Sequence, residues 1–337
     1  MKPIYLLVIL LTFVLNSAFA ANVGFEQFSL EDDTSRPLNV SIWYPTVQPS
    51  PKTVVGENPA FVGTEVIKAA TLDVRKAPVV LLSHGYRGSW RNLNWLATKL
   101  AKRGYVVAAP DHPGTTTFDR SPKQAAQWWQ RPRDISRVLS FLLNDTKRKH
   151  ALDAENISAI GHSLGGWTAM QLAGVEFDRH TMKQQCQLVF NQRTCGSAKE
   201  LGLTDIQPKE PLASSLKDTR IKRVVSLDLG LARGFSVQSM TRTQTPALIL
   251  AAGIDIGDLP QAMESGYLAE HLPLETRHYK VYEQATHFSF MQRCKAGAVD
   301  LLEKEYKGDG IICKDGFGIS REKLHARIFK DILWFLE

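Results

Sequence analysis

The chain alternates short apolar runs with segments whose apolar residues recur every three or four positions. Short apolar runs predict buried strands, and the longer spacing predicts helices with one buried face. The strands expected from this pattern cover 38–45, 77–85, 105–111, 156–163, 221–228, 245–253 and 277–287. The main helices are expected after Ser89, around 135–142, over 164–175 and from about Ser320. Strands that alternate with helices favour an α/β fold, with a mostly parallel sheet of roughly eight strands and helices on both faces.

One stretch, 176–219, interrupts this alternation. It is polar, contains two of the cysteines and shows no clear periodicity. A long segment without a regular pattern is uncommon inside a compact domain and usually has a function or is disordered. We therefore expect one domain over 21–337, with 176–219 as a cap-like insertion after the helix at 164–175.

The first residues, 1–20, have the form of a secretory signal peptide. Lys2 gives a positively charged start, an apolar run follows, and 18–20 read Ala-Phe-Ala. The run is shorter than the roughly 20 residues that a membrane-spanning helix needs. We therefore expect 1–20 to be removed and the mature protein to be periplasmic or secreted, with no stable membrane span.

The formal net charge of +7 is modest and spread along the chain. Its densest cluster, 147–149, follows an amphipathic segment and is typical of a solvated helix end. The charge therefore does not predict a nucleic-acid partner, and the sequence leaves the oligomeric state open.

The four cysteines are expected to form disulfides, because export places them in an oxidising compartment. Four cysteines allow three pairings. Proximity along the chain favours Cys186–Cys195 and Cys294–Cys313, each closing a short loop. No cysteine or histidine spacing typical of zinc sites is present, so neither a metal nor another cofactor is expected.

The most informative motif is the Gly-x-Ser-x-Gly at 161–165. Glycines on both sides of a serine allow the sharp strand-to-helix turn that exposes a nucleophilic hydroxyl, and they leave no Cβ to clash. The motif has this meaning only between a strand and a helix, and the pattern predicts both. Ser163 is therefore the candidate nucleophile.

A serine that attacks a carbonyl also needs backbone N–H donors for the oxyanion that forms. On this kind of turn one donor is the residue after the nucleophile, Leu164. The second is expected from the loop after the strand at 77–85, where Tyr86 offers its amide. His84, in the same loop, is expected to support the turn.

The candidate base is His287, which ends the last predicted strand. Its position downstream of any acid gives the chain order Ser–acid–His. His162 adjoins Ser163 but is expected to point away from it, because neighbouring side chains on a strand alternate between faces.

Two aspartates compete as the acid that orients His287. Asp228 and Asp255 both follow predicted strands, whose carboxyl ends meet at one edge of the sheet. Asp255 is favoured, because the strand after it leads directly to His287. Asp228 is the alternative.

These motifs together resemble the α/β-hydrolase fold: "SHGYRGS", "GHSLGG", "VVSLDLG", "AAGID" and "ATHFSF". Within that fold they are similar to exported dienelactone-hydrolase-like proteins and type II platelet-activating-factor acetylhydrolases, and more distantly to bacterial cutinases. The acetylhydrolase resemblance implies Asp228 as the acid, whereas the cutinase resemblance implies Asp255. Dienelactone hydrolases use a cysteine nucleophile, so Ser163 departs from that group.

The expected function is a secreted serine esterase that uses Ser163, His287 and an aspartate on a small-molecule ester, with short acyl chains preferred. The same residues can also cleave amides, so a peptidase or amidase is one alternative. A catalytically silent binding protein of the same fold is the other.

Overall fold

The computed structural model describes residues 22–203, 215–256 and 259–337. The predicted signal peptide at 1–20 lies outside these residues, as does the 204–214 part of the predicted insertion. The described residues form a ten-stranded sheet with the order β10-β9-β8-β7-β5-β6-β2-β1-β4-β3. The strands are β1 (Asn22–Leu30), β2 (Leu38–Thr46), β3 (Thr53–Val55), β4 (Thr64–Lys68), β5 (Ala77–Ser83), β6 (Val106–Asp111), β7 (Leu152–His162), β8 (Arg223–Leu227), β9 (Ala247–Ile254) and β10 (Arg277–Thr286).

The central part of the sheet is parallel, as the alternation of strands and helices predicts. Strands β6, β5, β7, β8, β9 and β10 pair in parallel, and β2 joins β6 in the antiparallel direction. The sequence pattern missed β1, β3 and β4. All three lie beyond β2, at one edge of the sheet. They carry exposed residues among the buried ones, so they lack a continuous apolar run.

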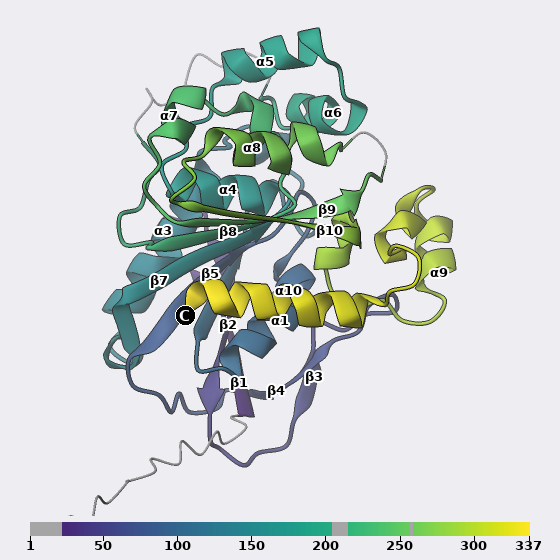
Figure 1. Cartoon of the computed structure of the whole chain (residues 1–337). Helices are drawn as coiled ribbons and strands as arrows, with labels where there is room; N and C mark the ends of the chain where they lie inside the picture. Colours follow the sequence, from purple (N-terminus) through teal and green to yellow (C-terminus); the bar gives the residue numbers. More distant parts are fainter. Residues whose placement is uncertain (1–21, 204–214, 257–258) are drawn as a thin grey trace, which may run out of the picture.

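Helices cover both faces of the sheet (Figure 1). One face packs against α1 (Asn94–Ala101) and α10 (Arg321–Leu336), and the other against α3 (Gln130–Asn144), α4 (Leu164–Leu172), α7 (Val237–Thr241) and α8 (Ser265–His271). The shorter helical segments are η1 (Trp90–Leu93), α2 (Pro122–Ala125), η2 (Lys149–Ala151), η3 (Ala232–Gly234), η4 (Gln261–Met263) and η5 (His287–Phe290). None of the helices in the described ranges is long and apolar enough to cross a membrane.

The segment predicted as an insertion contains two helices, α5 (Arg179–Leu188) and α6 (Gln192–Glu200). In Figure 1, α5 lies at the top, above α7 and α8, and α6 lies below α5 at about the height of α7. A disulfide between Cys186 and Cys195 joins them, which confirms the first predicted pairing.

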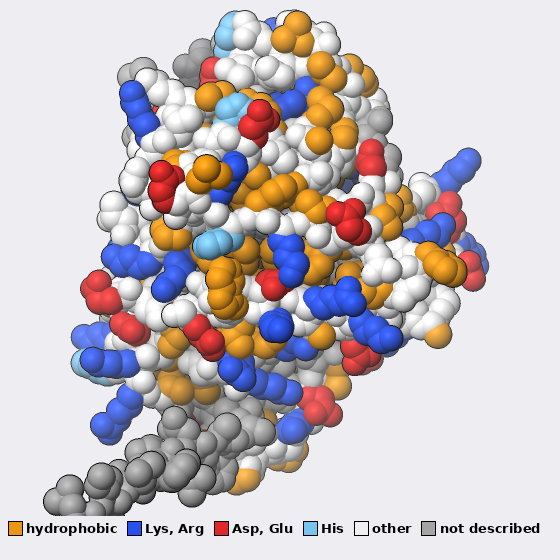
Figure 2. Space-filling model, viewed as in Figure 1, with side chains coloured by type: hydrophobic (Ala, Val, Ile, Leu, Met, Phe, Trp, Pro, Cys, Tyr) orange, Lys and Arg blue, Asp and Glu red, His pale blue; other side chains and the backbone are white. Residues whose placement is uncertain are grey.

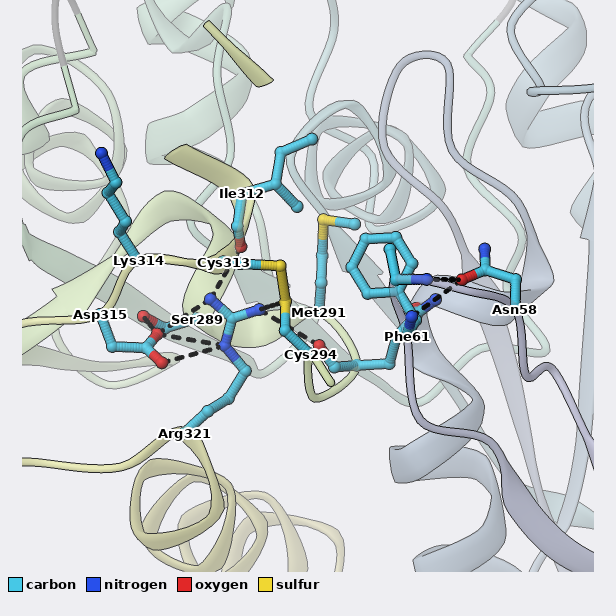
Figure 3. The surroundings of a disulfide bond; sticks show 12 residues. Asn58, Phe61, Ser289, Met291, Cys294, Ile312, Cys313, Lys314, Asp315 and Arg321 are labelled. Atoms are coloured by element: carbon cyan, nitrogen blue, oxygen red, sulfur yellow. Dashed lines mark hydrogen bonds and ion pairs between the residues drawn. A yellow bond between two sulfur atoms is a disulfide. The ribbon is translucent and has the colours of Figure 1, made fainter. Parts of the chain in front are cut away.

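A second excursion, 291–318, follows η5 and contains α9 (Ala298–Glu305) and η6 (Asp309–Cys313). The disulfide between Cys294 and Cys313 closes it and confirms the second predicted pairing. Ala298 and neighbouring apolar side chains form a separate small core with Ala60 and Phe61. Figure 3 shows Arg321 beside this disulfide, donating to Asp315 (Nε–Oδ1 3.1 Å).

Charged side chains are intermixed on the face that α10 crosses. In Figure 2, Lys and Arg on this face are interspersed with Asp and Glu and with hydrophobic side chains. The dispersed charge expected from the sequence is therefore visible on this face of the molecule.

Candidate active site

Ser163 occupies the sharp turn between β7 and α4, so the motif has the strand-to-helix setting that it requires. Its φ of 56° lies in the left-handed region, which side chains with a Cβ rarely adopt. The Ser163 N–H donates to Leu227 O (2.9 Å) on the neighbouring strand, which holds this conformation. Such strain in a well-held residue is typical of functional positions.

Glycines make the turn possible because the backbone segments are nearly in contact. A Cβ at Gly161 would lie 2.0 Å from Gly165 O, and one at Gly165 would lie 1.9 Å from Ser83 O. No side chain fits at these separations. The glycines of the motif therefore set how closely α4 approaches β5 and β7.

His287 and Asp228 form a buried pair at the carboxyl end of the sheet. His287 Nδ1–H donates to Asp228 Oδ2 over 2.6 Å, and both side chains are under a tenth exposed. Asp228 Oδ1 accepts a hydrogen bond from Ala252 N–H (2.8 Å). In the neutral ring this arrangement keeps the proton on Nδ1, so the Nε2 lone pair is free to accept a proton.

The preference for Asp255 as the partner of His287 is wrong in this structure. Asp255 is exposed and accepts a hydrogen bond from Leu259 N–H (3.0 Å). Leu227 pairs with Leu250 between β8 and β9, so Asp228 is level with the next residue, Ala251. Asp255 follows four residues later, about 13 Å further along an extended chain. The alternative, Asp228, is the residue at the level of the site.

His162 holds the backbone of the candidate base. Its Nε2–H donates to His287 O over 2.8 Å, and the two ring centroids are 4.7 Å apart. Burial keeps the pKa of His162 well below its usual value, so the ring is neutral. His162 therefore fixes the start of η5, where His287 lies.

The predicted oxyanion donors border the same space as Ser163. Tyr86 and Leu164 line one pocket together with Ser163 and His287. Among the described residues, neither of the two backbone N–H groups donates to an acceptor. Both amides are therefore available to a ligand.

His84 supports the turn that carries Tyr86, as predicted. Its Nδ1–H donates to Gly85 O (2.7 Å), and its Nε2 accepts from His112 N–H (2.9 Å). Burial keeps the pKa of His84 well below its usual value. Its ring therefore bridges two loops in the neutral form and is not a second base.

A buried polar network behind this turn was missed by the sequence analysis. Arg131 donates through Nη2 to His84 O (2.5 Å), and Asp134 accepts from His112 Nδ1–H (3.0 Å). Both charged side chains are almost fully buried on α3. Arg131, Asp134 and Val138 share the face that carries the apolar stripe of this helix. Two charged residues on a face expected to be buried could have indicated this network from the sequence.

Ser163 and His287 lie between two hollows of different size. The smaller, about 150 Å³, is lined by Leu164, residues of α6 and the loop after Asp228. The larger is a groove of about 580 Å³ between the Tyr86 loop and the 291–318 excursion. A substrate bound across Ser163 would therefore place one part in each hollow.

Comparisons with known proteins point to the same fold. Residues 75–190 match the family model described as serine aminopeptidase, S33. Over 96 residues, 28% of this chain, the sequence is 30% identical to cutinase est1 and 29% identical to cutinase 2, from Thermobifida alba and Thermobifida cellulosilytica. These stretches cover 29% and 33% of the two cutinases, so the chain spans a third of their length or less.

The structural match extends much further than the sequence matches. A ferulic acid esterase from Streptomyces cinnamoneus superposes with a TM-score of 0.62 at 18% identity, covering 94% of this chain and 88% of that one. The resemblance to dienelactone-hydrolase-like proteins and acetylhydrolases stays a prediction. The sheet order, the turn at Ser163, the family model and this superposition show that the chain has the α/β-hydrolase fold.

Proposed function

We propose that this protein is a serine hydrolase that cleaves carboxylic esters through a covalent acyl-enzyme. Ser163 Oγ attacks the ester carbonyl carbon while His287 Nε2 accepts the hydroxyl proton. His287 returns this proton to the leaving alcohol. A water molecule, deprotonated by His287 in the same way, then releases the carboxylic acid and restores Ser163.

The roles of the other residues follow from charge development. Asp228 keeps the His287 ring in the required tautomer and stabilises the imidazolium that forms after proton transfer. The Tyr86 and Leu164 amides donate to the oxyanion of each tetrahedral intermediate. Asp255 has no part in this scheme.

The 2.6 Å hydrogen bond between His287 and Asp228 carries the proposal, because it joins a base to its acid beside a strained serine. His287 and Ser163 also line both hollows. The relatives named as cutinases and a ferulic acid esterase act on esters, as their names state, and support the same reaction class.

The size of the smaller hollow supports a preference for short acyl chains. Its volume of about 150 Å³ is well below the roughly 300–1,000 Å³ of typical ligand pockets. An acetyl or propionyl group suits this space better than a long chain. The larger groove then receives the alcohol side of the ester.

A second candidate is an aminopeptidase, which the description of the matching family model suggests. Such an enzyme must hold the positively charged amino terminus of its substrate near the reactive serine. The groove beside Ser163 has the same sign of charge as that amino terminus and would repel it: its lining includes Arg87, Arg91, Arg120 and Lys307, with Asp309 as the carboxylate among the described lining residues. This charge favours the esterase.

The test is hydrolysis of p-nitrophenyl esters from acetate to long acyl chains, with fluorophosphonate labelling of the same samples. We expect rapid turnover of short esters and labelling of the wild-type protein, with both lost in Ser163→Ala. Matched anilides would be cleaved far more slowly. Faster cleavage of the anilides would establish the peptidase, and neither labelling nor turnover would leave the silent binding protein.

We also propose that the protein is exported and processed after residue 20. The two disulfides and the cutinase relatives are compatible with an extracellular location. Amino-terminal sequencing of the protein recovered outside the cytoplasm tests this proposal. The expected first residue is Ala21, and recovery of Met1 in that fraction would contradict it.

A further inference from the structure

We infer that the larger groove binds an ester that carries a carboxylate on the part lying in the groove. This inference rests on the proposed esterase function and specifies its substrate class. It follows from three features of the groove: its apolar walls, its surplus of positive charge and the environment of Arg91.

The walls of the groove suit a flat or aliphatic body. Phe61, Phe288, Met291 and Ile312 line it on the side of the 291–318 excursion. At about 580 Å³ the groove has room for a group larger than an acetyl. An uncharged aromatic ring alone would pack against this wall but would not interact favourably with the cationic side chains of the groove.

The charge of the groove is positive overall. Four cationic side chains line it: Arg87, Arg91, Arg120 and Lys307. Asp309 lies among them, and Glu200 of α6 pairs with Arg87 over 3.2 Å, where both side chains are about half exposed. The buried Asp111, whose pKa burial raises to about 7, also interacts with Arg91. At least one cation therefore remains in excess of these three carboxylates, so an anionic ligand would be attracted to the groove.

Arg91 is the most specific of these cations. Its guanidinium lies 5.3 Å from the Trp90 ring centroid and 5.0 Å from that of Phe118, so two aromatic rings hold it. Its Nε is buried and has no hydrogen-bond partner among the described residues. A buried donor without an acceptor is costly. A planar, ring-held guanidinium that lines the same groove as Ser163 is suited to receive a carboxylate.

Two pairs of matched esters test the inference on both sides of the scissile bond. The first pair is 4-acetoxybenzoate and 4-acetoxybenzamide, which differ by a charge on the leaving group. The second is 4-nitrophenyl hemisuberate and its carboxamide, which differ by a charge on the acyl group. Each kcat/KM is divided by the rate of spontaneous hydrolysis, because the members of a pair differ in intrinsic reactivity.

Because the groove receives the alcohol side in the proposed scheme, we expect the anionic member of the first pair to be favoured about tenfold, as for a charge-assisted hydrogen bond. A preference in the second pair alone would reverse that orientation of the ester. The preference should fall toward unity in Arg91→Gln and at high salt, which screens exposed charges. The control is Arg103→Gln, whose residue pairs with Glu337 and lines a different hollow. It should keep the wild-type preference.

The outcomes separate this inference from the function on which it rests. Wild-type protein that cleaves neutral esters but shows no charge preference in either pair would overturn the inference alone. A preference that survives in Arg91→Gln would overturn it as well. Loss of fluorophosphonate labelling and of all ester turnover would overturn the esterase proposal instead.

Discussion

At the scale of single residues, Asp228 is held in a backbone conformation that few side chains adopt. Its φ is 47°, in the left-handed region where aspartate is among the better tolerated residues. Its N–H donates to Leu250 O (2.7 Å), and its carboxylate bridges Ala252 N–H and His287. All three bonds direct the side chain toward His287, so the carboxylate is positioned before any substrate binds.

Replacing Asp228 with asparagine should lower kcat by roughly four orders of magnitude, as loss of the acid does in serine hydrolases of this kind. The amide NH₂ cannot accept the Nδ1 proton, so the ring favours the wrong tautomer. Asp255→Asn, an identical change at the exposed site, should stay near the wild-type rate. The measurement is steady-state hydrolysis of p-nitrophenyl acetate. Equal losses in both variants, or a larger loss in Asp255→Asn, would remove Asp228 from the scheme.

Gly165→Ala should destabilise the fold and reduce labelling of Ser163. The added Cβ would lie 1.9 Å from Ser83 O, which is backbone and can move only with β5. Overpacking of this kind typically costs about 1–3 kcal/mol, occasionally more. Urea unfolding and fluorophosphonate labelling measure the two effects.

Gly196→Ala is the matched control for that substitution. Gly196 lies inside α6, and among the described residues its Cβ would meet only Gln192 Nε2 at 3.8 Å. Alanine should therefore stabilise the protein by roughly 0.5–1 kcal/mol through helix propensity. A destabilised Gly196→Ala variant, or an unaffected Gly165→Ala variant, would contradict this account of the two glycines.

The sequence could single out Ser163 and His287, the proposed nucleophile and base, because their signals are local. Ser163 has its glycines within two positions, and His287 ends the last apolar strand. The aspartate that pairs with His287 could not be singled out, because Asp228 and Asp255 have the same sequence signal. The two aspartates differ in how far along the sheet they lie, which depends on the register of β9 against β8. That register is set by the pairing of the two strands and cannot be read from the residues around Asp228 or Asp255.

At the scale of elements, the predicted strands and helices were those with strong apolar patterns. Helices α5, α6 and α9 were missed, because each carries few buried apolar side chains. Their attachment depends on disulfides and hydrogen bonds to distant segments. Thr194 of α6, for example, donates to the buried Glu264 over 2.6 Å. The spacing of apolar residues along the chain does not reveal contacts of this kind.

Removing the Cys294–Cys313 disulfide should affect the groove more than the small hollow. The double variant Cys294→Ser/Cys313→Ser opens a loop of 19 residues, whose closure is worth about 3 kcal/mol in the chain-entropy model. Tyr306, Lys307 and Asp309 of the groove wall lie inside that loop. We expect a lower Tm and a raised KM for groove-filling esters, measured by thermal unfolding and steady-state kinetics.

The double variant Cys186→Ser/Cys195→Ser gives the complementary control. Its disulfide joins α5 to α6, and α6 lines the small hollow through Arg193, Thr194 and Ser197. Its effect should therefore appear as altered acyl-chain preference, with binding in the groove unchanged. The same kinetic pattern in both double variants would contradict separate roles for the two disulfides.

At the scale of the whole molecule, buried ionisable groups make stability depend on pH in opposite directions. Burial raises the pKa of Glu264 to about 7 and that of Asp111 to about 7. Burial also lowers the pKa values of four histidines: His84, His112, His162 and His325. The two acids make the folded protein less stable as pH rises from their ordinary pKa toward 7. The histidines make it less stable as pH falls below the ordinary histidine pKa of about 6.5.

Glu264→Gln isolates one of these contributions. Glu264 joins α6 to the loop after Asp228, since it also accepts from Ala232 N–H (2.8 Å). Between its ordinary pKa of 4.5 and about 7, the unfolded chain loses this proton before the folded protein does. Wild-type stability should therefore lose roughly 3 kcal/mol across this window relative to the variant. The measurement is urea unfolding of both proteins from pH 4 to pH 9. A constant difference between them would contradict the prediction.

The 291–318 excursion has its own covalent closure, and its small core includes Ala60 and Phe61. It also contacts the turn that carries His287, since Thr286 donates to Lys314 O (2.9 Å) and Ser289 donates to Asp315 (2.6 Å). Ser163 and Asp228 belong to the central sheet and lie outside it, and His287 precedes it. Changes in this segment should therefore act on the wall of the groove and on the turn that carries His287 together. A protein engineer who grafts a new wall here would therefore keep Lys314 and Asp315, so that the candidate base stays in place.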